Sequence, residues 1–455
     1  MHVVKRDFYR RRGARGGFLS QGTEKPFPLL FVAFATAIII RFSIPNNVLN
    51  VFEHYSTFSE SGSILEKFHP GSYGILVLTI LMLPRIFAAR LKDYDGILRS
   101  MFIMSTAVVF VMVICVLTGQ TSSLGYLIDS LFVACAAGSA ALCFTAAQRR
   151  LLGNALLVII VLSSIMAILE FFAKTRFLPQ DVTVLAGETS MRADGLYSHP
   201  LMLGLCNAVA IPILYLTNWA RPVKTAAITI LIMGIFAAGA RGAAIAGIIM
   251  LILGVIFTGG PRSEMGSRIV KKLFVIVGIL VLVPVLWFLA SSVGLTERFQ
   301  NEGLVDDSAM ARIIIFQVFG FLDWNELIWG VGNSELVKYA SLGLKLDFVE
   351  NSLIIYVFQF GIIGALCLVG ALLNALFALS RHTQVPLKLA LCTFLVVALA
   401  NNTLSSKSPA VVLIFILAIA FRDTVATKRE ALLSSQHRLR RHGAMPAHVG
   451  SLSEG

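Results

Sequence analysis

The sequence predicts an all-α polytopic membrane protein, with about twelve transmembrane helices and a large, partly helical loop between the ninth and tenth helices. Hydrophobic residues make up 57% of the 455 residues, charged residues make up only 14%, and the mean hydropathy is +0.81. A soluble globular domain does not sustain this composition. Apolar runs of about 20 residues match a hydrocarbon core of roughly 30 Å, and the alternating strands of a membrane barrel are absent, so we expect helical spans.

The apolar segments divide the chain into a transmembrane domain and two basic tails. We assign residues 1–26 and 422–455 to cytoplasmic tails and residues 27–421 to the transmembrane domain, which includes the loop over residues 294–351. The first apolar segment is long for a signal-peptide core and lacks a convincing small-residue cleavage site, so we expect an uncleaved span. The expected spans are Phe27 to Ile44, Tyr73 to Ala89, Met101 to Leu117, Leu124 to Ala147, Leu151 to Phe172, Leu201 to Leu216, Thr225 to Gly239, Gly242 to Thr258, Leu273 to Val293, Ser352 to Leu379, Leu387 to Asn401 and Ala410 to Phe421.

The Lys and Arg residues predict the orientation of the chain. Most of the 38 fall in segments that are cytoplasmic when both termini are cytoplasmic, and short basic loops resist translocation. The net charge of +13 then follows mostly from topology and from contact with anionic lipids, so we do not expect nucleic-acid binding. The main basic groups are Arg10-Arg11-Arg12, Arg149 and Arg150, the stretch Arg262 to Lys272, and Arg438-Leu439-Arg440-Arg441.

Several features fall outside the expected site. All six cysteines lie within expected spans without metal-ligand spacing, and no acidic cluster has such spacing, so we expect no disulfide, metal or other cofactor. No sequence period recurs and the two halves do not share a pattern of broken helices, which argues against an inverted-repeat transporter. Arg41 and Asp129, each near the outer end of an expected span, are interpreted as a structural ion pair.

Three segments on the expected outer side are long. They are Pro45 to Ser72, Ala173 to Pro200 and Gly294 to Asn351, and the third is the largest. Within it, Asp306, Asp307 and Ser308 favour the start of a helix over Ala309 to Leu322. That helix is apolar on most faces, so we expect it to pack on the membrane domain or to lie in the membrane interface.

The apolar stretch from Thr225 to Thr258 has to turn back on itself. As one helix it would be about 50 Å long, against a hydrocarbon core of about 30 Å. We place the turn at Ala238-Gly239-Ala240-Arg241-Gly242, where small residues permit a tight backbone. Each arm has about 15 to 17 residues, fewer than the roughly 20 needed to cross, so we expect a recessed turn. Arg241 lies against the positive-inside trend, which favours an anion-binding role over a snorkelling one.

The segment MRADGLYSHPLMLG carries two further candidates, Arg192 and His199. Pro200 suits the first turn of a helix, so His199 stands where a span begins. An imidazole at this point can serve as a base or as a hydrogen-bond donor. The alternative is an ordinary loop that enters a helix.

The remaining candidates lie in and after the large loop. The structural alternative to a functional role is, for Arg312, a solvated charge on the loop helix. For Gly330 and Gly332 it is a simple turn. Asn351 is a strong helix N-cap, and an acid such as Glu350 suits the helix dipole. A carboxylate at the membrane surface is also partly desolvated, which raises its pKa and suits it to general-base work.

Four motifs occur in order over residues 192–366: RADGLYSHPLMLG, GARGAAIAG, ARIIIFQVFGFLDWNELIWGVGN and ENSLIIYVFQFGIIGAL. Together they resemble the O-antigen ligase and O-antigen polymerase (Wzy-type) family of bacterial membrane glycosyltransferases. Arg241 matches the arginine of the family's RG turn, and Arg312 matches the arginine that opens the large-loop helix. Asn351 matches the asparagine of a frequent His-Asn pair, and Glu350 stands where the histidine is expected.

The resemblance implies an enzyme of the bacterial inner membrane that uses an undecaprenyl-diphosphate-linked glycan and an acceptor glycan on the periplasmic face. A flippase and a chain-length regulator are candidate partners. Arg241, Arg312 and Arg192 would hold the diphosphate, with Gly330, Gly332 and Asn351 as further substrate contacts. Glu350 is the first candidate base and His199 the second. Diphosphate is a good leaving group, so direct displacement without a metal would invert the anomeric carbon.

Three functions fit these expectations to different degrees. The first is a polymerase that extends an exopolysaccharide or O-antigen by transfer of lipid-linked repeat units. The second is a ligase that transfers the finished polymer to lipid A-core or another acceptor, and Glu350 in place of the histidine favours the polymerase over it. The third is a transporter or flippase for lipid-linked sugar, which would show charged residues within spans and pseudo-symmetric halves.

Overall fold

The computed structural model describes residues 28–53, 68–87, 94–120, 124–179, 192–257, 313–344 and 351–422, together with scattered residues between 273 and 349. Helices are the only regular secondary structure in these ranges, which confirms the all-α class. Four continuous helical stretches are long and apolar enough to cross a membrane, and six more apolar helices have 10–17 residues. The chain is therefore an α-helical protein with the composition and helix lengths of a membrane protein.

Eleven of the twelve expected segments are helical in the described ranges, with ends displaced by at most six residues. The remaining segment, Leu273 to Val293, lies almost wholly outside the described residues, so the count of twelve spans stays a prediction. The helices that correspond to the expected segments are α2 (Pro28–Ser43), α5 (Pro70–Ile86), α6 (Asp95–Leu117), α7 (Leu124–Tyr126) with η3 (Leu127–Phe132) and α8 (Val133–Ala141), α9 (Ala146–Ala173), α11 (Pro200–Leu214), α12 (Arg221–Ala237), α13 (Arg241–Phe257), α19 (Ser352–Ser380), α20 (Val385–Leu399) and α21 (Ala410–Arg422).

Short helices occupy the connections. They are α3 (Asn46–Glu53), η5 (Ile315–Phe321), α17 (Trp324–Trp329), α18 (Asn333–Lys338), η6 (Tyr339–Gly343) and η7 (Thr403–Ser405). Helix η5 is a 3₁₀-helix, so the second half of the helix expected over Ala309 to Leu322 is wound more tightly than an α-helix. The expected capping residues Asp306, Asp307 and Ser308 lie outside the described residues.

Two long helices are interrupted where the sequence predicts continuous ones. Helix η3, which contains Asp129, is a π-helix, a form that often occurs at functional positions. Helix α19 is broken at Gly361, which has a φ of +67°. Both interruptions coincide with contacts to other parts of the chain that are described below.

Helices α5, α11, α13, α19 and α21 all begin at one end of the bundle, which we call the Arg241 end. Hydrogen bonds join the connections at this end: Asn47 Nδ2 donates to the Ser198 carbonyl over 3.3 Å, and Asn46 Nδ2 donates to the Lys407 carbonyl. The helices therefore alternate in direction along most of the described chain. At the opposite end, Arg422 Nη1 donates to the last carbonyls of α19.

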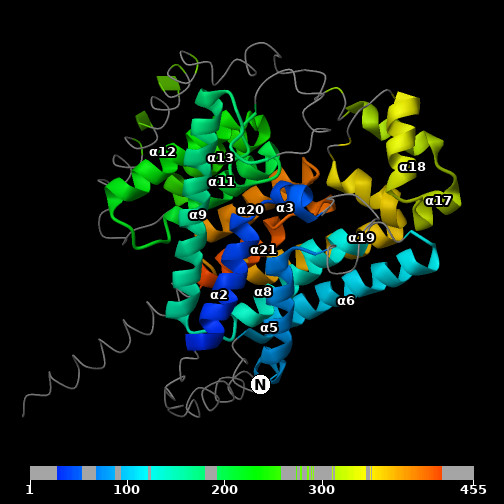
Figure 1. Cartoon of the computed structure of the whole chain (residues 1–455), viewed down its shortest axis with the longest axis horizontal. Coiled ribbons are helices and arrows are strands. Elements are labelled where there is room, and N and C mark those ends of the chain that lie inside the picture. Colours follow the sequence, from blue (N-terminus) through cyan, green and yellow to red (C-terminus); the bar gives the residue numbers. More distant parts are fainter. Residues whose placement is uncertain are drawn as a thin grey trace, which may run out of the picture.

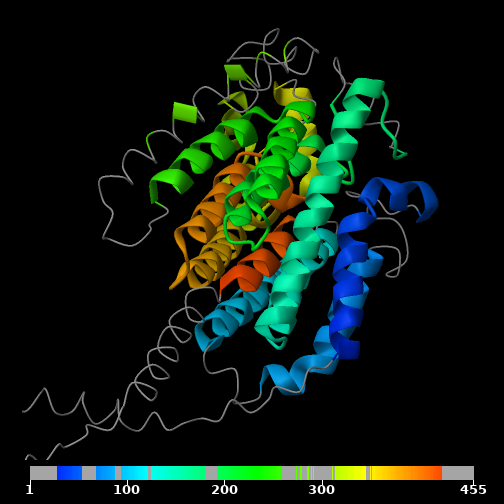
Figure 2. The ribbon, with the colours of Figure 1, turned by 90° about the vertical axis from the view of Figure 1, so that its left-hand side faces the viewer.

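Helices α11 and α21 form the centre of the bundle. Nearly every residue of both is buried, which explains why their sequences are apolar on all faces. Helices α9, α12, α13 and α20 surround α11, and α2 packs beside α9 (Figures 1 and 2). Figure 1 shows α17 and α18 at the right-hand side, next to α19 and away from α9 and α12. The Arg241 end thus has two separate regions, one around α12 and α13 and one around α17 and α19.

Candidate functional site

The turn between α12 and α13 carries Arg241, as the sequence predicts. Helix α12 ends at Ala237 and α13 begins at Arg241, and both helices have 17 residues. Gly239 has a φ of +61°, which favours glycine. Helix α11 approaches closely, since an added Cβ at Gly204 would lie 3.1 Å from the Cβ of Ala243. Small residues therefore permit both the turn and the packing, and the Arg241 side chain is half-buried.

This turn is recessed relative to the end of α9. Gly234 of α12 lies beside Ser164 of α9, because an added Cβ at Gly234 would be 2.9 Å from the Ser164 Cβ. Beyond this contact α12 continues for three residues and α9 for nine. Helix α9 therefore reaches about 9 Å farther, at 1.5 Å per residue. Arg241 lies below the rim that the end of α9 forms.

The segment before α11 places Arg192 against the same turn. The Ala193 N–H donates to the Ala237 carbonyl over 3.1 Å, and Arg192 Nε donates to the Ala238 carbonyl over 3.2 Å. A cation beside the last carbonyls of a helix interacts favourably with the helix dipole. This bond engages Nε, and the Nη groups of a guanidinium carry four further N–H donors. The structure thus brings together two of the predicted residues, Arg192 and Arg241.

Two residues that the sequence interpretation did not select, Arg176 and Glu170, hold this segment in place. Arg176 Nε and Nη2 donate to the Arg192 carbonyl over 3.2 and 3.0 Å. The buried Glu170 carboxylate accepts from the N–H of Phe177 over 3.1 Å and of Gly195 over 2.9 Å. One carboxylate therefore fixes both backbone segments that carry the arginines. The sequence feature that could have identified Glu170 is the presence of an acid in the last turn of an otherwise apolar span.

His199 is the N-cap of α11. Its Nδ1 accepts from the Leu201 N–H over 3.2 Å, and Pro200 is the first helical residue, as expected. Because Nδ1 accepts this bond, the neutral ring carries its proton on Nε2. Of the two roles expected for this imidazole, the geometry favours a hydrogen-bond donor over a base. The catalytic role itself stays a prediction.

Asn351 is the N-cap of α19, in agreement with the structural alternative considered for it. Its Oδ1 accepts from the N–H groups of Leu353 over 3.0 Å and Ile354 over 3.2 Å. The next residue, Ser352, donates from its N–H and its Oγ to the Asn401 carbonyl over 3.0 and 2.6 Å. Asn351 therefore lies next to the connection between α20 and α21, and its contact with substrate stays a prediction.

That connection is polar and buried, and it includes a cation that the sequence interpretation overlooked. Asn46 donates to the Lys407 carbonyl, and Ser130 Oγ donates to the Ser406 carbonyl over 2.8 Å. The Lys407 side chain lies beside Gly125, where an added Cβ would be 3.4 Å from Lys407 Cε. Lys407 is a basic residue in an expected outer loop, and this departure from the positive-inside trend is the feature by which Arg241 was selected as a candidate. The buried polar residues of this connection are Asn401, Thr403, Ser405, Lys407 and Ser408.

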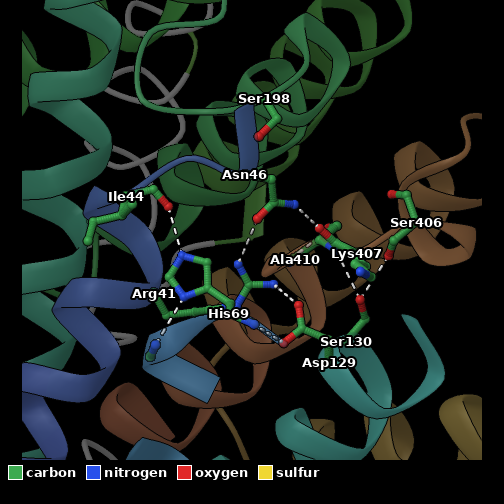
Figure 3. A network of polar contacts seen from close by, with 12 residues as sticks. Arg41, Ile44, Asn46, His69, Asp129, Ser130, Ser198, Ser406, Lys407 and Ala410 are labelled. Atoms are coloured by element: carbon green, nitrogen blue, oxygen red, sulfur yellow. Dashed lines mark hydrogen bonds and ion pairs between the residues drawn. The ribbon is translucent and has the colours of Figure 1, made fainter. Parts of the chain in front are cut away.

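A buried polar network lies below these connections (Figure 3). Arg41 Nη2 and Asp129 Oδ2 form an ion pair at 3.0 Å, and both side chains are buried, so the predicted structural ion pair is confirmed. Arg41 Nη1 also donates to Asn46 over 3.3 Å. The N–H of His69 donates to the second Asp129 oxygen over 3.2 Å, and the His69 ring accepts from the Gly71 N–H at Nδ1.

His69 precedes α5 and is neutral within this network. Its Nε2 lies 2.9 Å from the Ile44 carbonyl, to which it donates because Nδ1 is an acceptor. Burial, and second the neighbouring Arg41 guanidinium, lower the pKa of the His69 imidazole from its usual 6.5 to about 3. The network therefore holds one positive and one negative side chain that face each other, and an uncharged ring.

Gly330 and Gly332 form a turn that docks on the break in α19, which gives them a structural role. The N–H groups of Val331 and Gly332 donate to the Phe358 carbonyl over 2.7 and 3.2 Å, and Gln120 Nε2 donates to the Gly330 carbonyl over 2.7 Å. An added Cβ at Gly330 would lie 2.7 Å from the backbone nitrogen of Gly361. The predicted contact of these glycines with substrate stays a prediction.

Arg312 and Glu350 lie outside the described residues, so their predicted roles also stay predictions. Among the described residues, no three His, Cys, Asp or Glu side chains gather as a metal site, and the six cysteines are free thiols. No protein-family model and no curated protein sequence matches the chain. The arrangement found is a recessed turn with Arg176, Arg192 and Arg241 on adjoining segments, which we call the arginine cluster.

Proposed function

We propose that this protein is a polysaccharide polymerase that transfers undecaprenyl-diphosphate-linked glycan repeat units onto an acceptor glycan. The observation that carries the proposal is the contact of Arg192 with the Ala238 carbonyl, which holds the Arg192 guanidinium at the recessed turn that leads into Arg241. Planar guanidinium groups suit a diphosphate because they bind its oxygens in a bidentate manner and stabilise charge that develops there. The resemblance to the Wzy-type family supports the same chemistry.

The proposed reaction is a single displacement. A hydroxyl oxygen of the acceptor glycan attacks the anomeric carbon of the donor, and the bond from that carbon to the diphosphate oxygen breaks. The electron pair of that bond leaves with undecaprenyl diphosphate, whose added charge the arginine cluster and Arg312 stabilise. The hydroxyl proton passes to a base, for which Glu350 is the first candidate. This step inverts the anomeric centre and uses no metal ion.

The proposed location is the bacterial inner membrane, with both termini cytoplasmic and the Arg241 end at the periplasmic face. The arginines that bind helix ends opposite the Arg241 end support this orientation. Arg149 Nη1 donates to the Phe144 carbonyl over 2.8 Å, and Arg422 donates to the last carbonyls of α19. Basic residues are enriched on the cytoplasmic side of membrane proteins. A flippase would deliver the lipid-linked repeat unit to the periplasmic face, and a chain-length regulator would set the extent of polymerisation.

A deletion strain tests the proposal against the ligase alternative. Loss of a polymerase should leave single repeat units on the carrier lipid and no long polymer. Loss of a ligase should instead leave long chains on the carrier that never reach their final acceptor. Normal chain length and normal attachment in the deletion strain would contradict both enzyme functions. Surface polysaccharide gels together with a profile of the lipid-linked glycans distinguish these outcomes.

A transporter or flippase for lipid-linked sugar is the second candidate, and one observation favours it. Arg41 and Asp129 form a buried ion pair between helix α2 and the π-helix η3, and charged residues within spans are typical of transporters. Loss of a flippase would leave the repeat units on the cytoplasmic leaflet, where an enzyme added outside spheroplasts cannot reach them. Repeat units that remain accessible in the deletion strain would contradict the transporter function.

A further inference from the structure

The short helices η5, α17, α18 and η6 form a layer over the first part of α19, which we call the loop layer. A separate apolar cluster holds it there, and Phe321 and Tyr339 stack at 5.7 Å between η5 and η6. The buried members of that cluster are Ile315, Val318, Leu336, Ala340, Ile354, Ile355 and Phe358. Residues Ser352 to Phe360 of α19 therefore serve as the floor of the loop layer.

The break at Gly361 divides α19 into a part under the loop layer and a part of membrane-spanning length. Residues 362–380 continue as a helix of 19 residues, about 28 Å long, which matches the roughly 30 Å of a hydrocarbon core. The neighbouring helix α6 ends within one helical turn of the level of this break. Val111 lies beside Gly364, since an added Cβ there would be 3.7 Å from Val111 Cγ1. Helix α6 continues only six residues farther, to Leu117.

The loop layer is fixed at this level. An added Cβ at Gly361 would overlap the Ile328 carbonyl oxygen and lie 2.6 Å from the Trp329 nitrogen, so the end of α17 touches the break. Gln120, three residues after the end of α6, donates to the Gly330 carbonyl that follows α17. Helix α17 therefore lies beside both the end of α6 and the break in α19.

The loop layer exposes large apolar side chains. The exposed fractions are 80% for Trp324, 78% for Leu342, 65% for Ile313 and 56% for Phe316. Large exposed apolar surfaces on proteins mark interaction sites, and tryptophan is enriched where membrane proteins meet the headgroup region. Below the level of Gly361, α6 and α19 also expose apolar side chains, among them Phe110 and Leu366. The exposed apolar surface is thus present on both sides of this level.

We propose that the loop layer is embedded in the leaflet at the Arg241 end, with Trp324, Leu342, Ile313 and Phe316 among the phospholipid headgroups and upper acyl chains. The level of Gly361 and the lipid-facing residues just below it identify phospholipid as the occupant. This inference is independent of the proposed enzyme function. Its consequence is that a lipid-linked substrate can reach the Arg241 end along the membrane surface beside the loop layer.

Fluorescence quenching in vesicles tests this inference. The full chain has four tryptophans, and a variant with Trp219→Phe, Trp287→Phe and Trp329→Phe retains Trp324 alone. It is reconstituted into vesicles whose phospholipids carry bromine either near the carbonyl or near the end of the acyl chain. We expect the shallow bromines to quench Trp324 about twofold more strongly than the deep ones, and aqueous iodide to quench it weakly.

A second variant that retains Trp329 alone keeps the test available if the first does not fold, because α17 carries both tryptophans. The expected result is the same for both variants. The inference is overturned if aqueous iodide quenches the retained tryptophan as strongly as free tryptophan and neither bromolipid quenches it. It is also overturned if a soluble glycan or protein, rather than lipid, shields the residue from iodide.

Discussion

Two groups of charged side chains lie at the Arg241 end, and they differ in access. Arg41 and Asp129 are buried and form an ion pair, with the His69 backbone bonded to the same carboxylate. In the arginine cluster, Arg176, Arg192 and Arg241 are half-buried, and the bonds of Arg176 and Arg192 described above go to backbone carbonyls. The buried group is therefore suited to holding helices together, whereas the more accessible arginine cluster is the proposed anion-binding site.

Removing one partner of the buried pair should have the largest effect on stability. Asp129→Asn leaves the Arg41 guanidinium buried without its counter-charge, so we expect a loss of about 3–5 kcal/mol in the free energy of unfolding. Denaturant unfolding in detergent measures it. The double variant Arg41→Met/Asp129→Leu is the control and should recover most of the loss. A stable Asp129→Asn protein without transfer activity would show that this pair serves the reaction instead.

Arg241→Ala should affect activity rather than stability. Loss of one preorganised donor to developing charge lowers a rate by about 100-fold to 1,000-fold, so long polymer should disappear in a complementation assay. Membrane insertion and unfolding should stay near wild type, because a half-exposed side chain costs about 0.5 kcal/mol or less when truncated. Lys224→Ala, near the start of the preceding helix α12, is the matched control. Equal polymer length in both variants would contradict the anion-binding role of Arg241.

The loop layer offers a third kind of contact, made by backbone rather than charge. Gly361→Ala forces a Cβ into the Ile328 carbonyl and strains a positive φ, so we expect a loss of roughly 3 kcal/mol. Gly332→Ala is the matched control, with a φ of +86° but its nearest neighbour 3.7 Å away, and should cost about 1 kcal/mol. Thermal unfolding in detergent compares the two. Equal losses would mean that α17 does not rest on Gly361.

The smallest expected effect is a pH dependence of stability. The pKa of His69 is lowered to about 3 in the fold, whereas in the unfolded chain it is near 6.5. Between these values the unfolded state binds the extra proton, so the stabilising contribution of neutral His69 is present above pH 6.5 and declines as the pH falls towards 3. From pH 7 to pH 5 the loss should be about 2 kcal/mol. His69→Asn should remove this part of the pH dependence, and an unchanged profile would exclude His69 as its source.

The sequence predicted the features that depend on local pattern. Helix lengths and the turn before Arg241 follow from apolar run length and from small residues, and both are present. The break at Gly361 was not predicted, because it depends on the backbone of α17 pressing against a helix far away in the sequence. Glu170 and Lys407 were overlooked for a similar reason. Their roles come from the backbone groups of loops that the fold, and not the local sequence, places beside them.

Glycan transfer by the purified protein tests the role of the arginine cluster most directly. Wild type and Arg241→Ala are each reconstituted with undecaprenyl-diphosphate-linked repeat units, without an ion gradient, and the products are separated on a gel over time. Long polymer from wild type, and unreacted repeat units from Arg241→Ala, is the predicted result. Wild-type protein that carries the lipid-linked units across the vesicle membrane without joining them would contradict the proposed function.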